Sequence, residues 1–408
     1  MTKLPATAVY LGLEFLLSMP AFVVTAVYFV RVVHMSPLQL VLIGTVMEAA
    51  VFIFEIPTGA FADTYGRRLS VIISFLVQGV AVVLVGAVAS FWVIAVAWTI
   101  WGFGYTFQSG AFEAWITDEV GVERVGDMFL RGTRVAYTGA LLGLVGSVAL
   151  ALWSLRAAVI AGGLVTIAGG VGASLLMPET GFVRRPMEHR GRALRDVVGT
   201  AVEGAKHIRG RPLLLLLLAA AFFAGMSSEA FDRLGEAHFI RDIGLPHVGS
   251  LDPVVWFGVF GACVLLVGLA ASTVLIRKAE RLAGGAAATV TRLLLPLTAV
   301  LAVAELVFAL SGSIALALGA LLVARLARSL CDPLYLTWLN RGIADSRVRA
   351  TVISMSGQAD AIGQTAGGPV LGLLGNVYGI RVALVAGAAV LVPALGLYSR
   401  AAVRERVD

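Results

Sequence analysis

Apolar runs of about 20 residues recur along nearly the whole chain, and this feature constrains its fold more than any other. A helix of that length is what crossing the hydrocarbon core of a bilayer requires. The composition agrees, because 59% of the residues are hydrophobic and only 14% are charged. A soluble domain typically carries about 25% charged residues. The sequence therefore predicts an all-α membrane protein that crosses the bilayer many times.

Hydropathy windows of about 19 residues place twelve transmembrane helices in two sets of six. The first set lies near 8–30, 38–60, 71–89, 92–116, 128–150 and 157–177, and the second near 212–238, 254–276, 289–310, 314–338, 351–375 and 380–399. We predict an N-terminal six-helix bundle at 1–180, a cytoplasmic linker at 181–211 and a C-terminal six-helix bundle at 212–408. The arginine-rich linker is expected to be a solvated tether, with a regulatory site as the alternative.

A weak internal repeat relates the two halves. Residues 122–143 and 345–367 both run from a basic loop into a helix with small residues spaced by four. Two similar halves with a site between them are the general plan of many secondary transporters.

The distribution of Lys and Arg predicts the orientation. Most of these residues fall in loops that lie inside the cell if both termini are cytoplasmic. The net charge of +6 is therefore a topology signal spread over loops, and it does not indicate nucleic-acid binding. We expect a multi-pass protein of the inner or plasma membrane.

No cofactor or metal is expected, and no enzyme activity. The 2 cysteines lie in apolar runs and the 5 histidines are scattered, without the spacing of metal ligands. The phosphate-binding pattern G-x-x-x-x-G-K-[ST] is absent from the sequence. Energy for transport would therefore come from an ion gradient, unless transport is passive.

The stretch GAFADTYGRRLSV, residues 59–71, interrupts the apolar pattern with charges. Gly59 would permit close packing, and Gly66 would supply a turn. The two arginines that follow would hold this loop inside the cell. Asp63 needs a basic residue or the positive N-terminal end of a helix as a partner.

This stretch resembles the cytoplasmic loop motif G-x-x-x-D-x-x-G-R-[RK] of the major facilitator superfamily. The motif is matched by Gly59, Asp63, Gly66, Arg67 and Arg68, whereas Thr64 replaces the usual arginine. The resemblance covers the layout of the whole chain and implies the major facilitator fold. It also implies a gating contact between the halves through Asp63 and Arg67, with Asp118 as a partner for Arg67. The alternative is that these charges only fix topology.

Two glycine patterns resemble those of the drug/proton antiporters of this superfamily. The fifth-helix pattern keeps Gly139, Gly143 and Gly146 but has Leu144 in place of proline. The eleventh helix carries the fuller version, with Gly363, Gly367, Gly368, Pro369 and Gly372. Ordinary close packing is the alternative. Trp98 stands where those antiporters commonly have an arginine that attends proton coupling.

Ionisable residues at membrane depth are costly, so they mark pathways, proton sites or internal pairs. Our candidates for proton coupling are Glu14, Glu48, Glu55, Glu113 and Asp360. In the first half we expect Arg134 to hold Glu113 and Glu55, which would leave Glu48 as the proton carrier. In the second half Arg325 and Arg328 should pair with Asp332, Asp360 or Glu305, either as a static lattice or as a substrate contact.

Aromatic and polar residues on the predicted helices provide candidates for substrate binding. These are Trp101, Tyr105, Gln108, Arg134, Tyr137, Glu229, Asp232, Arg325 and Arg328. Part of the fourth-helix aromatic set lies at mid-membrane depth, where it could line a cavity for a bulky, partly apolar ligand.

With the resemblance, these features imply a monomeric secondary active transporter whose partners are a small-molecule substrate, protons and the lipid bilayer. Proton-coupled efflux of a small amphipathic compound is the expected activity. The first alternative is an ion-coupled or passive importer of a small polar metabolite. The second is a membrane receptor that does not transport.

Overall fold

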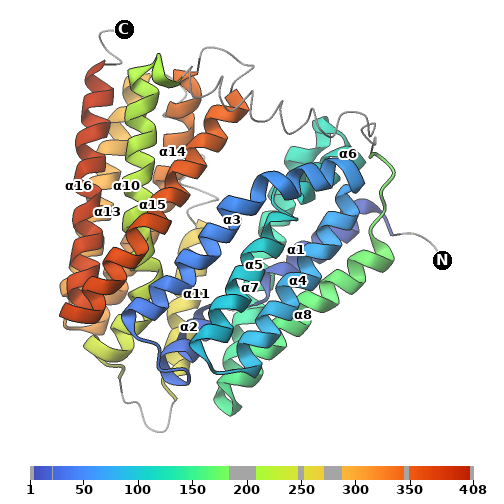
Figure 1. Ribbon diagram of the computed structural model, residues 1–408, viewed down its shortest axis with the longest axis horizontal. Helices are drawn as coiled ribbons and strands as arrows, with labels where there is room; N and C mark the ends of the chain where they lie inside the picture. The colour runs from blue at the N-terminus through green and yellow to red at the C-terminus, as the bar shows by residue number, and fades with distance from the viewer. Residues whose placement is uncertain are drawn as a thin grey trace. The chain divides into compact units, whose positions relative to one another are not determined.

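The computed structural model describes residues 4–20, 22–182, 208–246, 252–270, 287–343 and 349–404, and every regular element in these ranges is a helix (Figure 1). The all-α prediction is therefore confirmed over the described residues. The helices are α1 (Ala6–Ser18), α2 (Phe22–Arg31), α3 (Pro37–Tyr65), α4 (Arg67–Ala87), α5 (Phe91–Thr106), α6 (Ala111–Val120), α7 (Val122–Trp153), α8 (Leu155–Leu176), α10 (Pro212–His238), the π-helix η2 (Phe239–Ile243), α11 (Val254–Ala270), α13 (Ala287–Leu310), α14 (Ile314–Gly342), α15 (Arg349–Tyr378) and α16 (Ile380–Arg404).

Within the described ranges, 9 helical segments are long and apolar enough to cross a membrane. At two other predicted spans the helices are shorter, with 16 residues in α5 and 17 in α11. α15 is long enough to cross a membrane, but it is not among these 9 segments. The protein is therefore a multi-pass membrane protein, and the count of twelve spans stays a prediction.

Two predicted helices are interrupted. The helix expected near 8–30 is divided into α1 and α2, and Pro20, which has no backbone N–H, lies between them. The helix expected near 92–116 ends at Thr106 and restarts at Ala111, after Gly110 in the left-handed region with φ 72°. Hydropathy windows average over such breaks, so the predicted continuous helices were wrong at these two positions.

The chain forms two compact units. Unit 1 comprises the described parts of residues 1–35, 46–191 and 247–265, and unit 2 those of residues 36–45, 192–246 and 266–408. The first part of α3 falls in unit 2 and most of α11 falls in unit 1, and the predicted division at 1–180, 181–211 and 212–408 stays a prediction. Residues 183–207 of the predicted linker lie outside the described residues.

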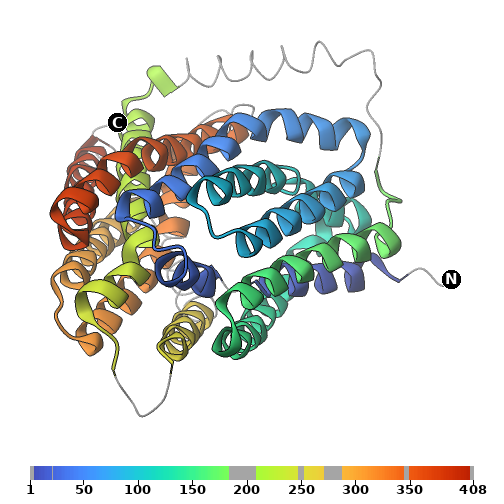
Figure 2. The same ribbon diagram turned by 60° about the horizontal axis from the view of Figure 1, so that its bottom comes forward.

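The same pairs of helices pack in each unit. In unit 1, α7 packs on α1, and both α5 and α8 pack on α4. In unit 2, α15 packs on α10, and both α14 and α16 pack on α13; the views in Figure 1 and Figure 2 show these helices side by side. The order of the pairs along the chain is the same in both units. The weak sequence repeat therefore has a structural counterpart, since its first segment and the described part of its second, 349–367, fall on α7 and α15.

Glycines permit the closest of these contacts. A Cβ at Gly139 or Gly143 of α7 would collide with the carbonyl oxygens of Phe15 and Met19 at α1. A Cβ at Gly363 of α15 would likewise collide with the carbonyl oxygen of Phe222 on α10, and one at Gly367 would collide with Met226. Small residues spaced by four thus let the backbones approach in both units. Gly146 differs, because a Cβ there would meet nothing within 4 Å.

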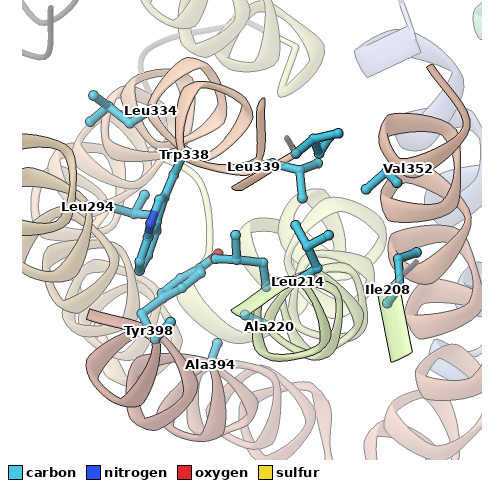
Figure 3. Close-up of a cluster of buried hydrophobic side chains, with 13 residues drawn as sticks. Ile208, Leu214, Ala220, Leu294, Leu334, Trp338, Leu339, Val352, Ala394 and Tyr398 are labelled. Carbon is cyan, nitrogen blue, oxygen red and sulfur yellow. The ribbon is translucent and has the colours of Figure 1, made fainter. Parts of the chain in front are cut away.

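Unit 2 has a buried apolar core at one end of its helices, shown in Figure 3. Leu214, Leu334, Leu339 and Val352 are each 2% exposed or less, and they come from α10, α14 and α15. The rings of Trp338 and Tyr398 lie 6.0 Å apart between their centroids, which joins α14 to α16. This core holds the unit-2 helices in place around the cavity described below.

Many large apolar side chains face outward. Trp92, Trp153 and Leu175 are 76%, 83% and 75% exposed, respectively. Apolar surface of this extent is uncommon on soluble monomers and is the usual condition of helices that face lipid.

Candidate functional site

Unit 2 contains a cavity of about 550 Å³ whose lining residues come from α10, α13, α14, α15 and α16. Its wall combines apolar side chains such as Leu301 and Ile353 with the phenol groups of Tyr335 and Tyr398. The charged lining residues are Asp232, Glu305, Arg328, Asp332 and Asp360. A cavity of this size and mixed lining suits a small amphipathic molecule.

Arg328 links two of these acids in a buried ion-pair network. Its Nη1 lies 2.8 Å from Asp232 Oδ2, and its Nη2 lies 3.0 Å from Glu305 Oε1. The second oxygen of Glu305, whose residue is only 2% exposed, accepts a hydrogen bond from Ser227 Oγ at 3.0 Å. Both oxygens of this buried carboxyl group are therefore engaged, one by a cation and the other by a hydroxyl.

Arg325 completes the network from the same helix. Its Nη1 lies 2.7 Å from Asp232 Oδ1, so Asp232 receives one arginine on each oxygen. Both guanidinium groups also lie over the Phe231 ring, at 5.3 Å and 5.6 Å from its centroid. The predicted pairing of Arg328 with Glu305 is confirmed, whereas Asp232 is a partner that sequence reasoning did not assign to these arginines.

Asp332 and Asp360 take no part in that network. Of the three predicted partners Asp332, Asp360 and Glu305, the described structure pairs Glu305 with Arg328, and both arginines also bind Asp232. Asp332 lies one turn after Arg328 on α14, but Arg328 extends to α10 and α13. Asp360 accepts a hydrogen bond from Gln364 Nε2 at 2.7 Å. Over the described residues, the cavity wall therefore holds two carboxyl groups that form no ion pair with an arginine, although Arg328 is near enough to act on both electrostatically.

Two predicted binding residues lie outside this cavity lining. Glu229 is 1% exposed and its Oε1 lies 3.2 Å from Arg233 Nε. A Cβ at Gly44 of α3 would collide with these two side chains, so the pair packs against the α3 backbone. Arg325 does not line the cavity either, but it forms an ion pair with the lining residue Asp232.

The acidic residues of unit 1 are arranged differently. Arg134 is exposed and forms no ion pair within the described chain, so the expected pairing with Glu113 and Glu55 is wrong. Glu55 instead accepts a hydrogen bond from Ser109 Oγ at 2.8 Å. Glu113 lies in the first turn of α6, where the positive helix end favours a carboxylate without any arginine. Glu14 hydrogen-bonds the Tyr10 hydroxyl one turn earlier on α1.

Aromatic rings form a row along one face of α5. Trp98 and Trp101 pack edge to face with centroids 5.6 Å apart, and Trp101 stacks on Tyr105 at 5.6 Å and 10°. Tyr105 is 36% exposed, and Glu48, Glu55 and Glu113 lie close enough to act on it electrostatically. Unit 1 thus brings together three of the predicted proton-coupling residues around a predicted substrate residue.

The break between α5 and α6 is held by hydroxyl groups from neighbouring helices. Thr58 Oγ1 donates to the Thr106 carbonyl at 3.0 Å, and Ser70 Oγ donates to the Phe107 carbonyl at 2.6 Å. Backbone groups freed at membrane depth need such partners.

Gln108 lies inside this break. Its side-chain oxygen accepts hydrogen bonds from Ser74 Oγ at 3.2 Å and from Gln78 Nε2 at 3.3 Å. Gln108 is therefore oriented by α4. Tyr137, the remaining predicted binding residue, is partly exposed on α7.

The motif at 59–68 forms a tight turn between α3 and α4. Gly66 has φ +119°, which side chains rarely tolerate, so the expected turn role is confirmed. Gly59 has no atom within 4 Å of an added Cβ, so the predicted close packing there is wrong. Asp63 lies at the end of α3.

Both arginines of the motif are engaged within unit 1. Arg67 Nη1 forms an ion pair with Asp118 and donates to the Ala114 carbonyl at 2.6 Å. Arg68 donates from Nη2 to the Ser174 carbonyl at 2.7 Å and from its backbone N to Glu179 Oε1 at 2.9 Å. The contact of Arg67 with Asp118 is present as expected, and its gating role stays a prediction.

Residues 178–181, which span the predicted start of the linker at 181, bind α6. Trp115 Nε1 donates to the Pro178 carbonyl at 2.7 Å, and Glu119 accepts from Thr180 Oγ1 at 2.7 Å and from Gly181 N at 2.9 Å. Partial burial raises the pKa of Glu119, but these hydrogen bonds outweigh it and the pKa lies below its ordinary value. In the sequence, only the acidic residue Glu119 at the end of α6 hinted at this contact.

Over the described ranges, no group of three or more His, Cys, Asp or Glu side chains is arranged to hold a metal ion.

Comparisons with known proteins agree with this architecture. The family model of the Major Facilitator Superfamily matches residues 7–359. The uncharacterised MFS-type transporter YxaM of Bacillus subtilis is 25% identical over 368 residues, which are 89% of this chain and 87% of that protein.

Solved structures show the same fold at low identity. A variant of the nucleoside transporter NupG has a TM-score of 0.81 at 11% identity, with 97% of this chain and 98% of that chain covered. A bacterial homologue of the human lysosomal transporter Spinster has a TM-score of 0.74 at 15% identity, over 97% and 95% of the two chains. The human organic anion transporter MFSD10 has a TM-score of 0.59 at 17% identity, over 96% and 98%. With a family model that matches most of its length, the chain belongs to the Major Facilitator Superfamily and is a transporter of that family.

Proposed function

We propose that the protein is a proton-coupled exporter of a small amphipathic compound that carries a positive charge. The observation that carries this proposal is the unit-2 cavity, in which Asp332 and Asp360 form no ion pair with an arginine of the described chain. A cationic group would supply the missing counter-charge, and protons would supply it when the cavity is empty. The apolar lining and the phenol groups would accommodate the rest of the molecule.

The acids of unit 1 support the coupling part of the proposal. Glu48, Glu55 and Glu113 lie within electrostatic range of one phenol, Tyr105. Carboxyl groups at membrane depth are costly to keep charged, so these acids readily bind protons. We assign proton exchange to this group together with Glu14, and we keep the gating role of Asp63 and Arg67 as part of the same proposal. We also propose that the protein transports as a monomer in the cell membrane, with both termini cytoplasmic.

Import of a small polar metabolite is the second candidate, and one observation favours it. Arg134 is exposed and has no ion pair in the described chain, so it could bind an anionic substrate. Arg325 and Arg328 are less suited to that role, because Asp232 and Glu305 already neutralise them.

Flux through purified protein in proteoliposomes, with an imposed pH gradient, separates the candidates. The panel should contain amphipathic amines, neutral amphipathic compounds, nucleosides and small organic anions. We expect amines to cross the membrane in the direction opposite to the protons. This flux should vanish when an ionophore collapses the pH gradient. Anion flux that Arg134→Gln abolishes would instead establish the second candidate. Binding of a ligand without any counterflow would indicate a receptor that does not transport.

A further inference from the structure

A polar stripe on one face of α15 lines the unit-2 cavity. Ser356, Asp360 and Gln364 follow one another at intervals of 4 residues, so they share a face of the helix. Ser356 is 4% exposed, and its Oγ lies 2.6 Å from the hydroxyl oxygen of Tyr335. Tyr335 in turn donates to the Leu217 carbonyl at 3.2 Å, so the Ser356 proton is used within the protein. Asp360 and Gln364 are the members of the stripe that are left for a ligand.

Asp360 and Gln364 are joined by one hydrogen bond. Gln364 Nε2 donates to Asp360 Oδ2 at 2.7 Å. A carboxylate that balances a cationic ligand is ionised and only accepts hydrogen bonds, so Gln364 has to offer it the amide nitrogen. In the described chain, this leaves two acceptors without a donor, namely Oδ1 of Asp360 and the side-chain oxygen of Gln364.

Asp332 adds a carboxylate from α14. It is exposed, it lines the cavity, and it forms no hydrogen bond or ion pair with the residues that the structure describes. It is near enough to Asp360 to act on it electrostatically. From α10, Gly225 leaves room for the Asp360 carboxylate, because an added Cβ would lie only 2.8 Å from Oδ1. Two carboxylates and an amide oxygen thus line the same region of the cavity.

We propose that the cavity selects a cation that can donate hydrogen bonds, a primary or secondary amine, and that Gln364 determines this selectivity. The inference rests on the proposed transport of a cationic compound and names the class of that cation. Such an ammonium group has two or three N–H donors, which suit the acceptors of Asp332, Asp360 and Gln364. A quaternary ammonium group carries the same charge without any N–H, so it would leave these acceptors unpaired. Gln364 was not among the sequence candidates.

The cavity is poorly equipped for a quaternary cation. Aromatic ring faces are the usual partners of such a group. In the lining that the structure describes, the aromatic residues are Tyr335 and Tyr398. Tyr398 is only 5% exposed, and its ring lies 6.4 Å from that of Tyr335 and 6.0 Å from that of Trp338, between centroids. Little ring surface is therefore open to a ligand, and the hydrogen-bond acceptors decide the selectivity.

Equilibrium binding to the purified full chain in lipid nanodiscs tests the proposal. The probes are arylalkylamines such as 4-phenylbutylamine, each paired with its N,N,N-trimethyl analogue, and empty nanodiscs correct for partition into lipid. Isothermal titration calorimetry measures Kd. We expect each primary amine to bind at least about tenfold more tightly than its analogue, because the analogue loses charge-assisted hydrogen bonds.

The other outcomes separate this inference from the proposed function. Equal affinities within the pairs, or tighter binding of the trimethyl compounds, would overturn the selectivity and leave a cationic substrate standing. If no member of any pair binds, the proposed export of cations fails together with this inference.

Gln364→Leu removes the amide and keeps the charge of Asp360. We expect the primary amine to lose about tenfold in affinity, whereas the trimethyl analogue should change by less than about threefold. Gln358→Leu is the matched control, because Gln358 lies on the same helix outside the cavity lining and should leave both affinities unchanged. An equal loss for both members of a pair would refute the role of Gln364 in selectivity. The wild-type comparison remains decisive if Gln364→Leu does not fold.

Discussion

Units 1 and 2 pair their helices in the same way and place their ion pairs differently. Gly143 of α7 and Gly363 of α15 occupy corresponding helices, and each lies against the backbone of the partner helix. In unit 1 the ion pairs of the described residues lie near helix ends, as Arg67 with Asp118 and Arg31 with Asp252, and all four side chains are 21–39% exposed. In unit 2 the network around Arg328 lies within the helix bundle and includes a carboxylate that is 3% exposed.

This difference separates two uses of a charge in a membrane protein. A buried acid that is held by an arginine contributes to the structure, because removing the arginine leaves an uncompensated charge. An acid without an arginine is costly to keep charged and is available to a proton or a cationic solute. Around one cavity, unit 2 contains acids that an arginine holds and acids that none holds. Among the described residues of unit 1, Glu14, Glu55 and Glu113 form no ion pair with an arginine.

The largest effect should follow from removing the central cation of unit 2. Arg328→Met leaves Asp232 with one arginine and Glu305 with only a serine, and we expect a loss of about 3–5 kcal/mol in the free energy of unfolding. The matched change in unit 1, Arg134→Met, breaks no ion pair and should stay within about 0.5 kcal/mol. Unfolding in detergent, followed by circular dichroism, measures both. Equal losses would remove the distinction between the two units.

The next effect tests the shared helix packing. Gly143→Ala and Gly363→Ala place a methyl group against a carbonyl oxygen of the partner helix, so each should cost about 1–3 kcal/mol. Gly146→Ala has free space around it and should be neutral, or stabilising by up to about 1 kcal/mol, because alanine favours the helix. Thermal unfolding of the three variants provides the comparison. A cost confined to one unit would mean that the repeat does not extend to these contacts.

The smallest effect belongs to the contact between α6 and residues 178–181. The pKa of Glu119 lies below its ordinary value of 4.5, so its contribution to stability is complete at neutral pH. That contribution is lost as the pH falls below about 4.5 and through the pKa of the folded state. Since the group is largely open to water, Glu119→Gln should cost at most about 1 kcal/mol at neutral pH. A wild-type stability advantage that persists unchanged at acid pH would contradict this assignment.

The sequence predicted the helices well because apolar run length determines where a chain can cross lipid. It did not predict the break at 107–110, since residues on both sides are apolar and only Gly110 signals it. It also did not predict the partners of the charged residues. Helical periodicity places Arg328 and Asp332 on one face of α14, but the choice between them depends on which acids α10 and α13 present to Arg328.

The most direct test of the account compares pH-gradient-driven flux of an amphipathic amine by wild-type protein and by Asp360→Asn in proteoliposomes. Asp360 forms no ion pair with an arginine in the part of the chain that the structure describes, so the variant should fold with a Tm near that of the wild type. We predict that its coupled flux falls at least about tenfold, or 1.4 kcal/mol in the barrier. Wild-type flux in a folded Asp360→Asn protein would contradict the claim that the unpaired acids of the cavity perform transport.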